Sequence, residues 1–324
     1  MRLVVQIPCL NEEETLPLVL KSIPKKIPGI DEIIILVIND GSTDKTVEIA
    51  KKYGVTHFIH HVSNQGLGRA FHDGMLKSLE LGADIMVNTD GDNQYPQSKI
   101  PDLVAPILRG EADIVISDRQ TDSIEHFSPF KKFLQKLGSL IVNTAAGTKL
   151  PDAVSGFRAY SRESMFRLNT ITRFSYCTET IIQASYKGLH ITSIPIKTNP
   201  KTRESRLFKS TGEHVRKSAI TIIRAYIMYK PYMIFGWLAG ILFIAGLIPF
   251  ARFIFYSIQA GNTRGHIQSL VVGSLFMISA FICLALNVIA DLVRTIRILT
   301  EDDLEQTKRH RFRELHGEHD HHAA

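Results

Sequence analysis

Two carboxylates and an amide stand close together in the stretch TDGDNQYP, which follows the apolar run IMV. Asp90 and Asp92 are separated by one residue, and Gln94 repeats the spacing. Carboxylate and amide oxygens suit Mg²⁺ or Mn²⁺, ions that take the rest of their coordination shell from substrate phosphates and water. Because many surface turns contain a DxD sequence, two alternatives stay open: an ordinary acidic turn, or a metal site facing a more negative partner.

The residues up to this stretch alternate between short apolar runs and helical patterns. We expect strands over residues 2–8, 32–40, 57–62 and 83–90, and helices over residues 11–23, 41–54 and 64–82. Strands that are apolar almost throughout and alternate with helices are typical of a parallel sheet covered on both faces. The predicted fold class is therefore α/β, with a Rossmann-like, mostly parallel sheet.

Polar clusters follow three of the predicted strands, at residues 8–13, 39–44 and 90–94. Ligands of such sheets bind beyond the C-terminal ends of the strands, so we expect the clusters to form one site. The glycines of NQGLG do not form GxGxxG, and no GxxxxGK[ST] sequence occurs. A dinucleotide-binding fold or a P-loop nucleotidase therefore has little support.

The chain changes character after its first two thirds. Two uncharged runs, residues 232–251 and 269–290, are each long enough to cross a bilayer core of ~30 Å. Buried helices of a soluble protein are the alternative interpretation. We expect a globular domain over residues 1–210, an amphipathic juxtamembrane (interfacial) helix over 211–231, a transmembrane hairpin over 232–292 and a tail over 293–324.

Basic residues predict the orientation of this hairpin. They flank both apolar runs, whereas the loop between the runs carries only Arg252 and Arg264. By the positive-inside rule, both ends of the hairpin are cytoplasmic, and the globular domain lies with them. The start of the chain lacks the apolar stretch of a secretory signal, and the three cysteines have no metal or redox spacing, which fits a reducing compartment. The modest net charge of +6 does not favour nucleic-acid binding.

Several blocks together carry a family resemblance. PCLNEE, INDGSTD, NQGLGRA and TDGDNQYP, in this order and spacing, resemble the GT-A fold of the family 2 glycosyltransferases. DAVSGFRAYSRE is similar to the second block of that family, and CTET to its acceptor-side acidic helix. The two C-terminal runs narrow the likeness to polyprenyl-phosphate glycosyltransferases, of the dolichyl-phosphate mannose synthase and undecaprenyl-phosphate glucosyltransferase type.

The resemblance implies a donor site for a UDP- or GDP-linked sugar and a divalent cation, Mg²⁺ or Mn²⁺. The implied nucleotide-sugar contacts are Pro8, Leu10, Glu12, Asp40, Asp90 and Gly91. The implied metal ligands are Asp90, Asp92 and Gln94, with Asp92 also a catalytic residue because it holds the metal under the diphosphate.

The resemblance also implies basic contacts to the phosphate of a polyprenyl acceptor. The candidates are Arg119, which is also a catalytic candidate, Lys131, Lys132, Arg203 and Arg206. One departure lies in the run PKTRESR, where Pro200 and Arg203 occupy positions at which the family often has arginine and glycine. The family expectation is inversion at the anomeric carbon, and hairpin-anchored relatives suggest self-association.

Two rival functions stay open at this stage. If the acceptor is a lipid hydroxyl, as in a glycolipid synthase, a carboxylate base is necessary, and Glu179 is the catalytic candidate with Asp152 second. The other rival is a non-catalytic membrane protein that binds sugar nucleotides. Such a regulator binds a nucleotide without releasing diphosphate, so turnover of the donor separates it from an enzyme.

Overall fold

The computed structural model describes residues 1–120, 129–172, 176–200, 220, 231–260 and 267–317, with the backbone alone at 129–134, 231–233 and 260. The chain divides into two compact units. The first comprises Met1–Ile222 together with Glu301–Ala324, and the second is Ile223–Thr300. The first unit contains the sheet, and the second contains most of the two long apolar helices.

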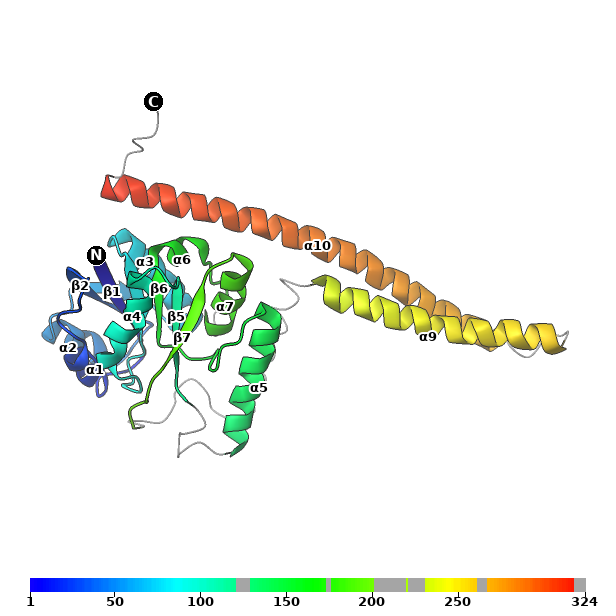
Figure 1. Cartoon of the computed structure of the whole chain (residues 1–324), viewed down its shortest axis with the longest axis horizontal. Helices are drawn as coiled ribbons and strands as arrows, with labels where there is room; N and C mark the ends of the chain where they lie inside the picture. The colour runs from blue at the N-terminus through cyan, green and yellow to red at the C-terminus, as the bar shows by residue number, and fades with distance from the viewer. Residues whose placement is uncertain (121–128, 173–175, 201–219, 221–230, 261–266, 318–324) are drawn as a thin grey trace, which may run out of the picture. The chain divides into compact units, whose positions relative to one another are not determined.

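The first unit is built on a seven-stranded sheet with the order β3-β2-β1-β4-β6-β5-β7. Figure 1 labels β1, β2, β5, β6 and β7 of this sheet. β6 is antiparallel to both of its neighbours, and the other pairings are parallel. The prediction of a mostly parallel sheet is therefore confirmed. The strands are β1 (Arg2–Cys9), β2 (Glu32–Asn39), β3 (His57–His60), β4 (Ile85–Asn88), β5 (Ile114–Asp118), β6 (Arg158–Ser161) and β7 (Ile191–Pro195).

Helices cover both faces of this sheet. Side chains alternate between the two faces along β1, so Leu3, Val5 and Ile7 all lie on one face. There they share a core with the helices that cover this face. Those helices are α1 (Leu16–Ser22), α2 (Thr46–Lys52) and α4 (Ile100–Leu108), the last preceded by the short 3₁₀ helix η1 (Gln97–Lys99). On the other face, Gln6 meets Gly74 of α3. The helices there are α3 (Leu67–Glu80), α6 (Arg162–Arg167) and α7 (Tyr176–Tyr186), and α5 (Pro129–Ala146) packs against α7.

The first helix begins later than its sequence pattern predicts. We expect a helix from residue 11, but α1 begins at Leu16. Asn11 adopts a φ of 57°, in the left-handed region that a helix cannot contain. The polar residues after β1 therefore form a loop, which leaves their side chains and backbone free to contact the loop after β2.

The second unit contains two helices long and apolar enough to cross a membrane, α9 (Pro231–Ala260) and the first part of α10 (Ile267–His316). Their backbones approach closely where Gly246 faces Gly273, since a Cβ on either would lie 3.2 Å from the other's carbonyl oxygen. Such small-residue contacts are common between membrane helices. Residues 252–260, expected in the loop, are helical. The predicted juxtamembrane helix over 211–231 lies almost wholly outside the described residues.

The C-terminal part of α10 belongs to the first unit rather than the second. The helix continues without interruption to His316. Phe312 on this part is only 4% exposed, and Glu301 is 5% exposed. The segment expected as a tail is therefore folded as far as His316.

Candidate active site

The sheet order brings the loops after β1, β2 and β4 together. β1 is the central strand of the three and is parallel to both neighbours, so all three chains leave the sheet at the same edge. The loops after β1 and β2 are joined by hydrogen bonds. Asn11 N donates to Ser42 Oγ at 3.0 Å, Thr43 N donates to Asn11 Oδ1 at 2.8 Å, and Glu12 N donates to Thr46 Oγ1 at 2.8 Å. Two of the three polar segments that follow the predicted strands are therefore joined directly.

The DxD loop packs against the loop after β1 through Gly91. A Cβ at this position would lie 3.1 Å from Cys9 Sγ, 3.1 Å from Glu12 Cγ and 3.5 Å from the Pro8 carbonyl oxygen. Glycine is therefore the residue that allows the two loops to approach so closely. This contact brings three predicted nucleotide-sugar residues together, since Pro8, Glu12 and Gly91 meet. Leu10, another residue of this group, lies on the same loop and is partly exposed.

Asp90, Asp92 and Gln94 are partly exposed on the loop after β4. Asn93 adopts a left-handed φ of 61°, and Gln94 N donates to Asp92 Oδ1 at 3.1 Å. Two carboxylates and an amide oxygen at a strand exit fit a hard divalent cation. Within the described part of the chain, no group of three or more His, Cys, Asp or Glu side chains gathers as a metal centre. Three side-chain oxygens fill only part of the coordination shell of such a cation.

Asp40, at the end of β2, joins three segments. Its Oδ1 accepts from Gln65 N at 2.8 Å and pairs with His61 Nδ1 at 2.7 Å, and its Oδ2 accepts from Gly66 N at 3.0 Å. The other ring nitrogen of His61 lies 3.2 Å from Asp73 Oδ2. Asp40 thereby positions the NQG turn that begins α3. No motif marks His61 in the sequence, and only these contacts identify it.

The second block lies beside the DxD loop. A Cβ at Gly156 would lie 3.1 Å from Tyr176 Oη and 3.4 Å from Asp90 Oδ2. Tyr176 Oη donates to the Gly156 carbonyl at 2.9 Å and accepts from Asn88 Nδ2 at 2.7 Å. Gly156 N in turn donates to Tyr95 Oη at 3.1 Å. The glycine of VSGF is therefore enclosed between two buried tyrosines and the first aspartate of the DxD.

Arg158 is a fully buried cation that holds the second block to α7. Its guanidinium donates to the carbonyls of Ser155 at 2.6 Å, Cys177 at 3.0 Å and Ala153 at 3.0 Å. It also donates to Thr180 Oγ1 at 3.0 Å. A charge buried in this way needs several acceptors to offset its desolvation. The sequence pattern does not separate Arg158 from a surface arginine on a strand.

Arg119 and Asp152 form a largely buried bidentate ion pair. Arg119 Nε lies 2.6 Å from Asp152 Oδ2, and Nη2 lies 3.0 Å from Oδ1. Burial by itself lowers the pKa of the Arg119 guanidinium, but Tyr95 and Asp152 raise it overall, so the charge persists. Burial also raises the pKa of Tyr95, and the nearby Asp90 raises it further. Tyr95 directly follows the DxD loop, and its hydroxyl accepts from Gly156 N of the second block, which also carries Asp152.

Glu179 lies on α7 and is 2% exposed. Its Oε2 accepts from Ile171 N at 3.1 Å, from Thr172 N at 3.1 Å and from Thr172 Oγ1 at 2.9 Å. These three hydrogen bonds fix the segment after α6 against α7. Such contacts support a role in holding this segment.

The remaining basic candidates are less fully described. Lys131 and Lys132 lie in the first turn of α5, where the backbone alone is described. Arg203 and Arg206 lie outside the described residues. The chain that leads to them is anchored, because Asn199 N donates to Gln94 O at 2.9 Å and Asn199 Nδ2 to Asn93 O at 3.0 Å.

Comparisons with known proteins agree with this geometry. A UDP-N-acetylglucosamine–dolichyl-phosphate N-acetylglucosaminyltransferase of Methanococcus voltae is 30% identical over 59% of this chain and 83% of its own length. An undecaprenyl-phosphate mannosyltransferase of Micrococcus luteus is 27% identical over 69% of this chain and 93% of its own. Glucosyl-3-phosphoglycerate synthase from Mycobacterium tuberculosis, solved with Mn²⁺, UDP-glucose and phosphoglyceric acid, superposes with a TM-score of 0.54 at 25% identity, covering 69% of this chain and 79% of that one.

The family comparison covers most of the residues of this site. The profile described as Glycosyl transferase family 2 matches residues 4–167, about half of the chain. This range contains the loops after β1, β2 and β4 and the second block. The fold, the joined loops and this match together establish that the chain belongs to glycosyl transferase family 2, with the GT-A fold.

Proposed function

We propose that this protein is a membrane-anchored, metal-dependent, inverting glycosyltransferase that moves a sugar from a UDP- or GDP-linked donor to polyprenyl phosphate. The observation that carries the proposal is the arrangement at one sheet edge, where the DxD loop meets the loop after β1 and the second block, which carries Asp152, the ion-pair partner of Arg119. The relatives named for dolichyl-phosphate and undecaprenyl-phosphate acceptors support the acceptor class.

On the donor side, Pro8, Leu10, Glu12 and Asp40 contact the nucleotide, and Asp90 and Gly91 lie at its ribose. When bound, Mg²⁺ or Mn²⁺ at Asp90, Asp92 and Gln94 would stabilise the negative charge that gathers on the diphosphate leaving group. The protein's own part is to hold the diphosphate in a fixed orientation. The close Gly91 contact and the buried Asn88–Tyr176 bond keep both ends of the DxD loop in place.

On the acceptor side, the lipid phosphate is its own nucleophile. Its second pKa is ~6, so it is mostly ionised at neutral pH and needs no base. It needs cations to position it, and a guanidinium held by Asp152 is oriented before the substrate arrives. The chain anchored at Asn199 begins the segment that carries Arg203 and Arg206, which we propose as further phosphate contacts with Lys131 and Lys132.

We place this reaction on the cytoplasmic face of a membrane. The apolar windows of α9 and α10 have mean hydropathies of 2.2 and 2.4. Many of their large apolar side chains are not covered by other parts of the protein, which suits contact with lipid. The basic residues on both sides of the hairpin support cytoplasmic ends. We also propose that the anchored protein self-associates.

Replacing the metal ligand tests the donor side of the proposal. We expect Asp92→Ala to lose transfer by a factor of about 10³ with a nucleotide sugar, polyprenyl phosphate and Mn²⁺, because one preorganised electrostatic contact is worth that much. Mass analysis of the lipid measures the product. Asp102→Ala, which removes an exposed carboxylate at the start of α4, is the matched control. Near-normal turnover of Asp92→Ala overturns the metal assignment.

Glu179→Gln separates the two classes of acceptor. The amide cannot act as a base, so transfer to a lipid hydroxyl would collapse, whereas transfer to a phosphate needs no base. We expect transfer to polyprenyl phosphate to persist in this variant. Its loss in a protein that keeps its melting temperature would favour a base-dependent reaction.

A further inference from the structure

Residues 301–316 of α10, here called the C-terminal arm, belong to the first unit and contribute side chains to its interior. Phe312 lies edge-on to Phe166 of α6, with ring centroids 5.5 Å apart. The guanidinium of Arg162 lies 4.4 Å from the centroid of the Phe312 ring. An aromatic side chain buried in this way contributes to the stability of the unit as a core residue does. The arm is therefore a structural part of the unit.

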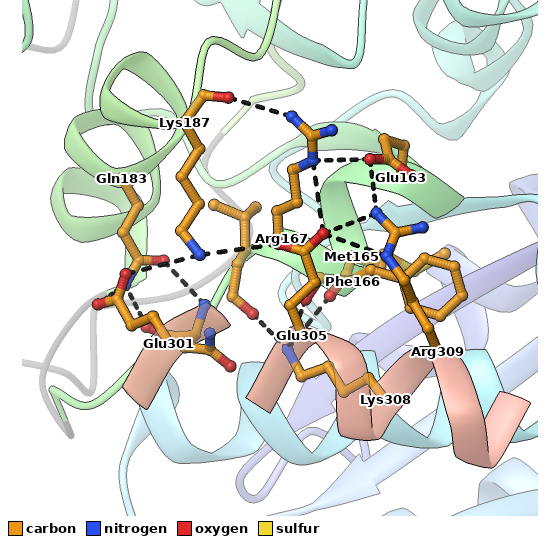
Figure 2. Close-up of polar contacts among 12 residues, drawn as sticks. Glu163, Met165, Phe166, Arg167, Gln183, Lys187, Glu301, Glu305, Lys308 and Arg309 are labelled. Carbon is orange, nitrogen blue, oxygen red and sulfur yellow. Dashed lines mark hydrogen bonds and ion pairs between the residues drawn. The ribbon is translucent and has the colours of Figure 1, made fainter. Parts of the chain in front are cut away.

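Lys308 of the arm completes the end of α6. Its Nζ donates to the carbonyls of Met165 at 3.3 Å, Phe166 at 3.3 Å and Leu168 at 2.6 Å (Figure 2). The last carbonyls of a helix have no partner within the helix, and a lysine can supply one. Leu168, which follows α6, is extended, and it begins the segment that leads to α7.

Charged residues of the arm also contact the C-terminal end of α7. Glu301 accepts from Gln183 Nε2 at 3.4 Å and lies 3.6 Å from Lys187 Nζ. Glu305 lies 4.0 Å from the same Nζ, and both contacts are visible in Figure 2. Lys187 is 14% exposed, so these acidic residues offset a cation that is largely removed from water.

The segment between α6 and α7 is held from both sides. Gln183 accepts from Asn169 N at 2.8 Å and donates to Asn169 O at 2.6 Å. Glu179 accepts from the backbone of Ile171 and Thr172. Lys308 holds Leu168 O from the arm. Residues 168–172 are thus fixed by α7 and by the arm together.

The opposite end of α7 supports the DxD strand. Tyr176, in the first turn of α7, stacks on Phe71 with ring centroids 3.9 Å apart. Its hydroxyl joins Asn88, the last residue of β4, to Gly156. One helix therefore contacts the arm through Gln183 and the strand before Asp90 through Tyr176.

We propose that the C-terminal arm is a positioning element for catalysis, which holds α7 and residues 168–172 in place behind the DxD loop through Lys308 and Glu301. Neither residue touches the predicted substrate sites, so both act through α7. The contacts that Lys308 and Glu301 make are to the end of α6, the residue after it and the C-terminal end of α7. The arm therefore affects the geometry of the reacting groups more than the binding of the nucleotide. The kinetic test of this inference rests on the proposed function.

The test uses the full-length protein in detergent. Lys308→Met keeps most of the apolar stem of the side chain and removes its three hydrogen bonds. We expect kcat to fall about tenfold, which corresponds to about 1.4 kcal/mol, with KM for the nucleotide sugar changed less than about twofold. We also expect faster hydrogen exchange in residues 168–172 and α7, and unchanged exchange in β1 and β2.

Two further variants keep the test decisive. Glu301→Gln has nearly the same shape and lacks the charge beside Lys187, so we expect a smaller loss of kcat of the same kind. Arg311→Ala removes an exposed ion pair from the arm to Glu80 of α3 and serves as the matched control with normal kcat. Normal kcat in folded Lys308→Met and Glu301→Gln overturns the proposal, as does faster exchange throughout the unit.

Hydrogen exchange requires no substrate, so it separates this inference from the proposed function. If the wild-type protein transfers no sugar to polyprenyl phosphate, the proposed function fails. The exchange pattern of the variants still decides whether the arm holds α7. Local loosening of α7 and residues 168–172 supports the positioning role, and its absence rejects that role.

Discussion

Removing the carboxylate of Asp152 leaves a buried guanidinium without its partner. The two hydrogen bonds to Arg119 measure 2.6 and 3.0 Å, and the side chains of Arg119 and Asp152 are 14% and 3% exposed. Truncating one member of such a pair costs about 3–5 kcal/mol, because the remaining charge stays in a medium of low polarisability. Each kcal/mol shifts the melting temperature of a unit of this size by about 2–4 °C. We expect Asp152→Ala to lower it by roughly 10 °C.

The chain contains a matched pair at its surface. Arg109 and Glu111 form the same two-pronged contact, with both distances 2.7 Å, but both side chains are more than half exposed. Water already solvates these charges, so we expect Glu111→Ala to leave the melting temperature nearly unchanged. Thermal unfolding of the full-length protein, followed by intrinsic fluorescence, measures both variants. Equal shifts in the two variants would refute the reasoning from burial.

The Asp152 variants also test the acceptor side. Asp152→Asn keeps one acceptor oxygen, so we expect an intermediate melting temperature. If Arg119 positions the lipid phosphate, transfer should fall in both variants below the melting transition, while binding of the nucleotide persists. Unchanged transfer in a folded Asp152→Ala protein would remove the Arg119–Asp152 pair from the proposed acceptor site.

Two further predictions concern the second block and the arm. Gly156→Ala forces a methyl group against Tyr176 Oη and the carboxylate of Asp90, an overpacking that costs about 1–3 kcal/mol, so we expect kcat to fall at least tenfold. Gly138→Ala, which has open space around it, is the control. Equal kcat values for the two variants in steady-state kinetics would contradict this prediction. Burial lowers the pKa of Lys308 to about 7, whereas the unfolded chain keeps its proton to about pH 10. Between these pH values the folded state therefore binds fewer protons than the unfolded chain, which makes unfolding less favourable as the pH rises. The melting temperature of the wild type minus that of Lys308→Met should therefore increase above pH 7 and stay constant below it. A difference that shrinks with rising pH would contradict this sign.

The order of strands and helices up to Asp90 follows from local patterns. The strands predicted at residues 2–8, 32–40, 57–62 and 83–90 correspond to β1, β2, β3 and β4. Short apolar runs and turn residues act over a few positions, which is why they can be recognised in one sequence. The predicted start of the first helix at residue 11 is wrong, because Asn11 takes a left-handed conformation that serves the contact with the next loop.

The candidate site is predictable where its residues share one turn. Asp90, Asp92 and Gln94 stand at fixed spacing after an apolar strand, and Asp40 ends another strand. Their partners are not predictable in the same way. His61 and Tyr176 have no spacing signal, and each acts through a contact to a distant residue, as in the bond between Tyr176 and Asn88, 88 positions apart.

The sequence by itself determined the chemistry available at the sheet edge, since strand alternation and the DxD spacing specify which oxygens leave a buried strand together. It also determined two membrane-length helices, because length and hydropathy are local properties. Only the tertiary structure decided that Arg119 is held by Asp152 and that Lys308 closes the end of α6, 140 positions away from Leu168. Contacts over such separations depend on which surfaces pack together in the folded protein, and the spacing of residues along the chain does not specify this packing.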